Sequence, residues 1–283
     1  MVIKKILNNS AVTTIDDATN IEKVVMGRGI AFQKKTGDII NEDKIEKIFS
    51  IENKNDNLKF QSLISEVPIE HIKVSENIIS YAKRKLDTKF DEHIYIALTD
   101  HLSFAFKRYS KGIKIKNNLL WDIKRIYKNE YNIGIWAIEY IKGEIGIKMD
   151  EDEAGFIALH LIDASLNESM DNTINITEII DSILSIIKYY FSIEFNEEDM
   201  SYDRLLTHLK YFAQRVVSGK VTREEEKSFL KMVKDNYKEA YRCVSKIKDF
   251  IEENYDYEVK SGEIVYLTLH VQRVTSSLKN REI

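Results

Sequence analysis

The chain has 283 residues, 43% of them apolar, a net charge of −4 and a single cysteine. Its apolar content is enough for two or three domains with their own cores, whereas one cysteine excludes an internal disulfide and a cysteine-rich zinc site. No apolar run approaches the ~18 residues of a membrane helix, and the net negative charge argues against nonspecific nucleic-acid binding by the whole chain. We therefore expect a soluble, cytoplasmic protein.

Residues 1–56 are typical of a small antiparallel β-sheet. Short runs of β-forming residues, the first starting at Val2 and the last ending at Phe32, alternate with turns. The turn residues are Asn8-Asn9, Asp16-Asp17 and Gly27-Arg28-Gly29. So small a unit has a marginal core and gains from pairing with a second copy, so we predict a homodimer. The polar run at 53–57 is typical of a linker.

Charge is uneven within this domain. Six basic and three acidic side chains in the first 35 residues give a net +3, and the remainder of the domain has a net −3. Nucleic-acid binding would therefore be local to the basic part. There Gly27 and Gly29 let the backbone approach a partner closely, while Arg28 and Phe32 offer groups that stack on bases. The alternative is a glycine-stabilised hairpin with Phe32 in its core.

From residue 58 onward the apolar periodicity is helical. One proline and ten glycines in the whole chain leave little to interrupt helices. Apolar residues recur at helical spacing in five segments, which are 78–86, 94–105, 157–164, 179–187 and 205–216. A polar stretch at 168–173 separates the third segment from the fourth. We therefore expect two all-α helical bundles, residues 57–170 and 171–283, after the β domain.

Four histidines recur in two matching contexts. His101 in HLSFAFKR corresponds to His208 in HLKYFAQR, and His160 in EAGFIALH corresponds to His270 in EIVYLTLH. The offset is 107 residues for the first correspondence (208 − 101) and 110 for the second (270 − 160). Agreement of two patterns in order and spacing indicates a duplicated module. A histidine pair kept in both copies favours histidine chemistry or sensing over a single catalytic centre.

The histidines admit more than one role. A neutral imidazole is a nucleophile near pH 7 and can accept a phosphoryl group, which adds close to two negative charges. The spacings lack the His-x-x-x-His and His-x-x-Glu patterns of metal sites, so we expect no resident metal and no cofactor. The ordinary alternative is a neutral core histidine with backbone partners. For His71 and His93, which have no counterpart in the repeat, we expect a surface or structural role.

Several long segments together resemble one known family. They are IKKILNNSAV near the start, MGRGIAFQKK at 26–35, ALTDHLSFA at 97–105, NNLLWDIKRIYKNEY at 117–131, EDEAGFIALH at 151–160 and INITEIIDSILSIIKYYFSIEFNEE at 174–198. In this order they resemble the transcriptional antiterminators of the BglG/SacY/LicT family, closest to those that govern β-glucoside use. The resemblance covers nearly the whole chain.

The resemblance implies a regulator and not an enzyme. An N-terminal co-antiterminator domain would form a β dimer that binds an RNA hairpin in a leader transcript and prevents a terminator from forming. Two regulation domains would receive phosphate on histidine from the sugar phosphotransferase system. A sugar-specific permease would modify His101 and His160 and switch the protein off, and the histidine-containing phosphocarrier protein would modify His208 and His270 and favour the active dimer.

The family's RNA-contact pattern falls on seven positions of this sequence, which are Lys5, Asn8, Ser10, Gly27, Arg28, Gly29 and Phe32. Ser10 departs from the asparagine that is usual there. A hydroxyl replaces an amide that carries both donor and acceptor groups, so we expect a base contact to be lost or bridged by water. The nearby lysines Lys4, Lys34 and Lys35 are candidates for phosphate contacts, which position RNA without reading it.

Two other classes of function remain as alternatives. A DNA-binding operon activator with duplicated regulation domains would need a helix-turn-helix segment, which the β-type N-terminus does not favour. An enzyme, such as a metal-dependent one, would need metal ligands brought together by the tertiary fold. The sign of each phosphorylation effect does not follow from physics, because the added charge either repels an apposed subunit or attracts a cationic group such as Arg108 or Arg215.

Overall fold

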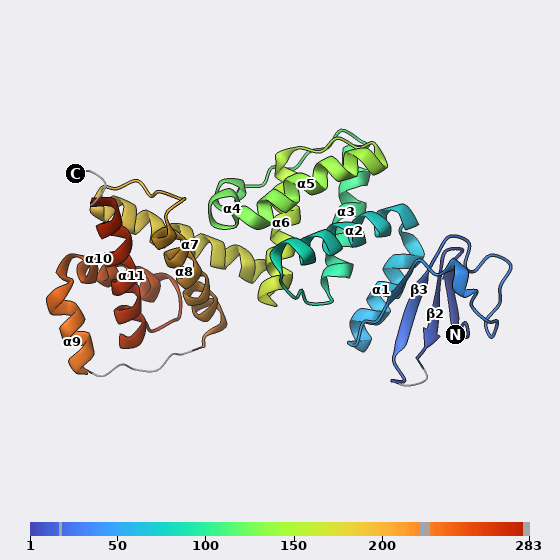
Figure 1. Cartoon of the computed structure of the whole chain (residues 1–283), viewed down its shortest axis with the longest axis horizontal. Coiled ribbons are helices and arrows are strands. Elements are labelled where there is room, and N and C mark those ends of the chain that lie inside the picture. The colour runs from blue at the N-terminus through green and yellow to red at the C-terminus, as the bar shows by residue number, and fades with distance from the viewer. Residues whose placement is uncertain (17–18, 221–226, 280–283) are drawn as a thin grey trace. The chain divides into compact units, whose positions relative to one another are not determined.

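The computed structural model describes the chain except residues 17–18, 221–226 and 280–283. It forms two compact units (Figure 1). The first contains residues 1–117 and 129–167, and the second contains residues 118–128 and 168–283. In the described residues, no helix combines the length and the apolar character that crossing a bilayer requires.

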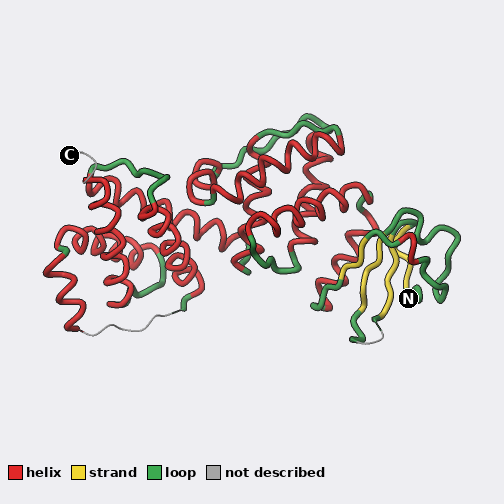
Figure 2. The backbone as a smooth tube through the Cα atoms, in the orientation of Figure 1, coloured by secondary structure: helices red, strands yellow, loops and turns green. Residues whose placement is uncertain are grey.

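The first unit begins with a four-stranded antiparallel sheet. Strands β1 (Lys5–Asn8), β2 (Ala11–Ile15), β3 (Glu22–Met26) and β4 (Lys47–Phe49) are hydrogen-bonded in chain order, and a short 3-10 helix, η1 (Glu42–Lys44), precedes β4 (Figure 2). The predicted antiparallel sheet is confirmed. The run from Ile30 to Phe32 is a turn and not a strand, and β4 was missed. Part of the predicted turn at Asp16-Asp17 lies outside the described residues.

Each face of this sheet is covered by a different segment. Helix α1 (Lys54–Glu66) packs on one face through Phe60 and Ile64, which meet Val24 and Met26. The loop after β3 covers part of the other face, where Ile30 and its neighbours meet the central strands. Its core residues are Ile3, Val12, Val25, Ile30, Ala31 and Ile40. The sheet is thus the middle layer of three.

The prediction of a linker at 53–57 was wrong, because these residues begin α1. The Asn53 side chain caps the helix by accepting hydrogen bonds from the backbone N–H groups of Asn55 and Asp56. Asn57 is buried and donates to the carbonyl oxygens of Glu22 and Ile51 at 2.6 and 3.1 Å. Its amide therefore fastens the helix to the sheet.

Four further helices complete the first unit. They are α2 (Ile69–Leu86), α3 (Ile94–Tyr109), α5 (Lys128–Ile145) and α6 (Glu151–Leu166), and they enclose one apolar core. Helices α5 and α6 approach closely at Gly134, where an added Cβ would lie 2.1 Å from the carbonyl oxygen of Ala154. Glycine is required there by space and not by backbone conformation. The helical periodicity of 78–86, 94–105 and 157–164 is confirmed.

The second unit has helices and no strands among its described residues. It contains α4 (Leu120–Ile126), α7 (Met170–Phe191), α8 (Met200–Ser218), α9 (Lys227–Asn236), α10 (Lys238–Asn254) and α11 (Ser261–Lys279). Helix α7 is the centre of the core, and its isoleucines from Ile176 to Ile187 that face inward have no exposed surface. Helix α4 belongs to this unit although α5, which follows it, belongs to the first. An ion pair from Arg125 to Asp181 joins α4 to α7.

Candidate functional site: two histidine pairs and a glycine-rich turn

The first histidine pair lies between α3 and α6. The rings of His101 and His160 are 4.8 Å apart between centroids. Nε2 of His101 lies 3.1 Å from Oε2 of Glu153, which precedes His160 on α6 by about two helical turns. The other carboxylate oxygen of Glu153 accepts a hydrogen bond from the guanidinium of Arg108 on α3. One buried carboxylate therefore joins His101 to Arg108.

The charge on Glu153 is stabilised by these two partners. Burial alone would raise the pKa of this carboxyl, but the hydrogen bond from His101 and the pairing with Arg108 hold its pKa below the ordinary value. Burial, followed by the nearby His101, lowers the pKa of His160 to about 3. His160 is therefore neutral at pH 7, and its Nδ1 is a buried atom without a hydrogen-bond partner.

The second pair lies between α8 and α11. The rings of His208 and His270 are 3.9 Å apart, and Tyr266 packs on both at 4.9 and 5.2 Å. Burial, followed by the neighbouring His208 and Arg273, lowers the pKa of His270 to about 4. The pKa of His208 is lowered as well, by burial and then by Arg215. Both imidazoles are thus neutral and available as nucleophiles at pH 7.

The carboxylate equivalent to Glu153 has different partners in the second module. Oε1 of Glu263 accepts from Nε of Arg215 at 3.1 Å and from the hydroxyl of Tyr257 at 2.8 Å. Both repeats contain this carboxylate and this arginine, but the sequence assigned a role to the histidines and the arginines and none to the carboxylate. In the first module, by contrast, the carboxylate joins Arg108 to His101.

The two remaining histidines lie elsewhere. Nδ1 of His71 is 3.4 Å from the hydroxyl of Ser103, its ring packs edge-on against Phe106, and burial lowers its pKa. His93 precedes α3 and lies 3.5 Å from a carboxylate oxygen of Asp56. Both positions fit the structural or surface role that was expected. Within the described ranges, no group of three His, Cys, Asp or Glu side chains is placed to hold a metal ion.

The glycine-rich turn after β3 is tightly held. A Cβ on Gly27 would lie 1.7 Å from the carbonyl oxygen of Lys44, and Gly29 has a positive φ of 65°. The Gly27 N–H donates to the carbonyl of Ser10 at 2.9 Å, so this turn lies beside the turn between β1 and β2. Arg28 is exposed and the Phe32 side chain is 60% exposed. The alternative that places Phe32 in the core was therefore wrong.

The other expected contact positions surround this turn. Lys5 is exposed on β1. The Asn8 amide is already engaged, because its Nδ2 donates to the carbonyl of Ile64 on α1 and its Oδ1 accepts from the Ser10 N–H, both at 2.7 Å. Lys4 forms an ion pair with Glu22 at 3.0 Å. Asn8 thus joins the first turn to α1.

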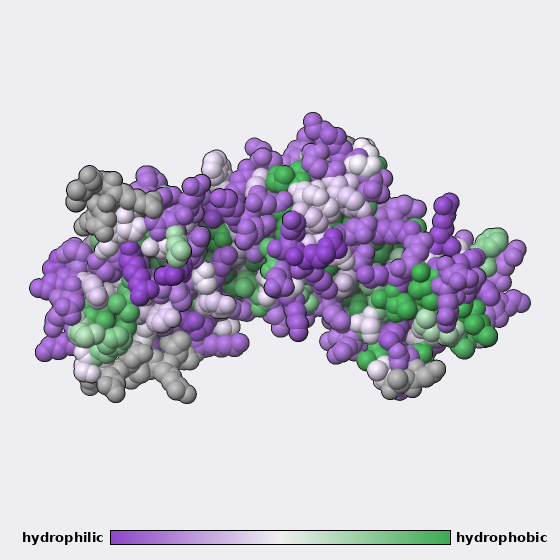
Figure 3. Space-filling view, viewed as in Figure 1, coloured by the Kyte–Doolittle hydropathy of each residue, from purple (hydrophilic) through white to green (hydrophobic). Residues whose placement is uncertain are grey.

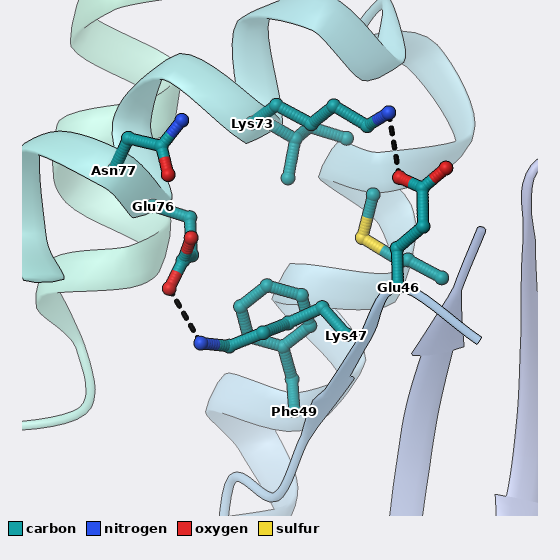
Figure 4. Close-up of a pocket in the computed structure, with 8 residues that line it drawn as sticks. Glu46, Lys47, Phe49, Lys73, Glu76 and Asn77 are labelled. Atoms are coloured by element: carbon teal, nitrogen blue, oxygen red, sulfur yellow. Dashed lines mark hydrogen bonds and ion pairs between the residues drawn. The ribbon is translucent and has the colours of Figure 1, made fainter. Parts of the chain in front are cut away.

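The same turn is connected to α2. The Arg28 N–H donates to the carboxylate of Glu46 at 3.2 Å, and Glu46 pairs with Lys73 at 2.6 Å. Next to it, Lys47 pairs with Glu76 at 2.5 Å across a small cavity (Figure 4). The hydrogen bond from Lys73 lowers the pKa of Glu46, so its charge is kept. Two ion pairs therefore link the sheet to the first helical bundle.

Comparison with known proteins assigns these parts to two domain families. Residues 1–58 match the CAT RNA binding domain, and residues 76–164 and 181–274 each match the PRD domain. The chain belongs to the family of CAT–PRD transcription antiterminators. The repeat inferred from the histidines coincides with the two PRD matches, because each match contains one histidine pair.

Individual relatives agree with this membership over their full length. The chain is 49% identical to the transcription antiterminator LicT of Bacillus subtilis (strain 168) over 274 residues, which are 97% of this chain and 99% of LicT. It is 41% identical to the β-glucoside operon antiterminator of Dickeya chrysanthemi, over 99% of each chain. The crystal structure of GlcT CAT-PRDI matches 58% of this chain and 97% of its own, with 34% identity and a TM-score of 0.51. The first two relatives are named as antiterminators.

Proposed function

We propose that this CAT–PRD antiterminator binds an RNA hairpin in the leader transcript of a sugar-utilisation operon and prevents a terminator from forming. The observation that carries the proposal is the exposure of Arg28 and Phe32 on a glycine-restrained turn inside the CAT RNA-binding match. An exposed guanidinium and an exposed aromatic ring are the groups that stack on unpaired bases. The names of the relatives favour β-glucosides as the sugar class.

The RNA surface would be formed by the two adjacent turns. Its members would be Lys5, Asn8, Ser10, Gly27, Arg28, Gly29 and Phe32, with Lys34 and Lys35 as phosphate contacts. Because the Asn8 amide is bound to Ser10 and Ile64, its part would be to shape the turn, while Arg28 and Phe32 contact the bases. The sheet at the N-terminus takes the place that a helix-turn-helix would need, so the DNA-binding alternative loses its support.

The proposal includes a homodimer of the sheet domain. The face of the sheet that the 30–40 loop covers has an uncovered apolar part, visible over the strands in Figure 3. Its exposed side chains include Val2, Ile39 and Ile48. An apolar patch of this kind on a domain with a small core marks a protein contact, and a second copy is the partner that buries it symmetrically.

Control would be exerted by phosphate on histidine in three domains arranged as residues 1–56, 57–170 and 171–283. The sugar-specific permease of the phosphotransferase system would modify His101 and His160, and the phosphocarrier protein would modify His208 and His270. The placement of each pair between two helices, with His160 and His270 held neutral by burial, supports this assignment. The added charge would bias which face of each bundle is available for association.

The test is binding of the full chain to the leader hairpin, with and without phosphorylation by purified phosphocarrier protein. We expect specific binding that rises with phosphate and does not rise in the His208→Ala/His270→Ala variant. Binding without any response to phosphate would place the control elsewhere. Failure to bind in either state would remove the RNA function.

A single substitution tests the RNA surface. Arg28→Ala removes one exposed guanidinium without opening the core, so we expect affinity for the hairpin to fall by about 1–3 kcal/mol at unchanged thermal stability. Lys59→Ala is the control, because it removes one positive charge from the exposed side of α1. Equal affinity of Arg28→Ala and Lys59→Ala for the hairpin would contradict the assignment.

A further inference from the structure

The two PRD modules share their sequence pattern but differ in what the buried carboxylate binds. In the first module Glu153 contacts both His101 and Arg108. In the second, the equivalent Glu263 contacts Arg215 and Tyr257. Among the described residues, no carboxylate lies within hydrogen-bonding distance of His208 or His270. In the part of the chain that the structure describes, a carboxylate therefore binds a ring nitrogen of the histidine in the first module alone.

We propose that Glu153 is a positioning residue, which binds Nε2 of His101 and so directs the incoming phosphoryl group to Nδ1. This rests on the proposed function, because it assumes that His101 accepts phosphate. The assignment of the nitrogen follows from the geometry around His101 in three steps.

The first step is the rigidity of the carboxylate. Glu153 has no exposed surface and Arg108 is only 6% exposed, so neither side chain exchanges its partner for water. A charge-assisted hydrogen bond in such a place is stronger than at the surface, and breaking it would leave a buried charge without its partner. Nε2 of His101 is consequently occupied while the module is folded.

The second step is the tautomer. In the neutral ring, the nitrogen that donates to a carboxylate carries the proton, so the lone pair is on Nδ1. His101 retains 17% of its side-chain exposure. Nδ1 of His160, in contrast, is buried without a hydrogen-bond partner. In this tautomer the nucleophilic nitrogen of His101 is Nδ1, on a ring that is partly exposed.

The third step is the transfer itself, for which the donor is a phosphohistidine on a protein of the phosphotransferase system. The lone pair of Nδ1 forms the new N–P bond while the N–P bond of the donor breaks, and that electron pair returns to the donor imidazole. The proton on Nε2 stays in the hydrogen bond to Glu153. Positive charge that develops on the ring lies beside the carboxylate, which stabilises it.

Attack through Nε2 would meet two obstacles. The hydrogen bond to Glu153 would have to break, and the phosphoryl group would then lie against the buried carboxylate. Two groups that carry like charge at contact distance in a buried place repel strongly. At the equivalent place in the second module, Glu263 is instead held by Arg215 and Tyr257.

The test locates phosphate on the ring in the full chain labelled with 15N-histidine. A His160→Ala/His208→Ala/His270→Ala variant is phosphorylated in parallel by two donors: the phosphocarrier protein with the permease of the neighbouring operon, and phosphoramidate, a small phosphoryl donor. Coupling between 31P and 15N identifies the modified nitrogen. The signal is assigned to His101 by its loss when His101→Ala is added.

The outcomes separate this inference from the proposed function. Phosphate on Nδ1 from both donors supports both. Phosphate on Nε2 of His101 overturns the inference and leaves the proposed function intact. Phosphate on Nδ1 from phosphoramidate but none from the protein donors supports the positioning role and contradicts the proposed function. No phosphate on His101 from either donor overturns both.

Matched variants test the part played by the carboxylate. Glu153→Gln should slow phosphorylation of His101 by roughly tenfold to a hundredfold and give a mixture of the two isomers. Glu263→Gln, at the equivalent place, should leave the isomer on His101 unchanged. Glu153→Asp keeps the charge but draws the carboxylate back from α3, so that it no longer reaches His101, and it should also give a mixture. If all three variants give Nδ1 alone, Glu153 does not choose the nitrogen.

Discussion

At the scale of single residues, the turn that would contact RNA is determined by space as much as by conformation. Gly27 has an ordinary negative φ, yet the carbonyl oxygen of Lys44 occupies the place of its Cβ. At Gly29 the backbone conformation is the constraint and space is not. Its φ is positive, while an added Cβ would meet only Phe32 at 3.9 Å. The two glycines of one Gly-Arg-Gly motif are therefore required for different reasons.

This difference predicts different costs. Gly27→Ala should force the turn away from η1 and lower the free energy of unfolding by more than about 2 kcal/mol, with loss of hairpin binding. Gly29→Ala should cost only about 1 kcal/mol, which is the strain of a positive φ. Chemical denaturation of the two variants, with hairpin binding measured in parallel, compares them. An equal loss of unfolding free energy in the two variants would show that the backbone near Lys44 moves to make room for the added Cβ.

The sequence indicated the residues of the site better than their contacts. The histidine pairs were visible because the repeat places them at equal offsets, and the structure brings each pair to within 5 Å between ring centroids. The role of Glu153 was missed because a glutamate in a helical pattern is usually a surface residue. The presence of Glu263 at the equivalent position of the second repeat could have indicated this role, since a carboxylate at a core-facing position in both repeats needs a partner.

At the scale of elements, short or polar segments were the ones that the sequence did not predict. Strand β4 has only Ile48 and Phe49 as apolar residues, and it is ordered by pairing with β3. The start of α1 is rich in asparagine, which is also typical of linkers. Only tertiary contacts distinguish a cap such as Asn53 or a buried amide such as Asn57 from solvated residues. A long apolar stripe such as that of α7, in contrast, predicts a helix from its periodicity alone.

The docking of α4 on α7 depends on pH. Burial, followed by repulsion from Asp181, raises the pKa of Asp122 to about 6. The unfolded chain releases this proton near pH 4 and the folded chain near pH 6, so stability falls as pH rises through that window. The asparagine of Asp122→Asn cannot ionise, so the variant should not lose this stability as pH rises. Above pH 6 the variant should be more stable than the natural chain. The shift in the pKa of Asp122 sets an upper limit of about 3 kcal/mol on this gain. Because Asp122 is partly exposed, the measured gain should be smaller than that limit.

Urea unfolding at pH 4.5 and pH 7.5 measures this effect. The gain from Asp122→Asn should be small at the lower pH and larger at the higher one. Asp171→Asn, which changes an exposed acid in the first turn of α7, is the control and should show no such growth with pH. A variant that is less stable at both values would mean that the pairing of Asp122 with Arg125 outweighs its repulsion from Asp181.

At the scale of the whole molecule, the sheet domain has an apolar depression that its own chain leaves open. Val2, Ile15 and Ile48 line it together with the polar Thr14 and Lys23. Helix α1 covers the opposite face, so the depression is the part of the sheet at which a second copy can pack. Association there would also place two RNA-contact turns in one assembly, which a monomer cannot do.

A charge in this depression should prevent association. Ile48 is 39% exposed on β4, and Ile48→Lys would place an ammonium in the apolar contact of the proposed dimer. We expect the dissociation constant of the dimer to rise on the order of a hundredfold, which corresponds to about 2.7 kcal/mol. Leu58→Lys is the control, because Leu58 is 53% exposed on α1, the helix on the other face. Sedimentation equilibrium of the full chain should give a dimer for Leu58→Lys and for the natural chain, but a monomer for Ile48→Lys at the same concentration. Equal association of the two variants would place the contact between copies outside the sheet, and the open depression would then need another partner.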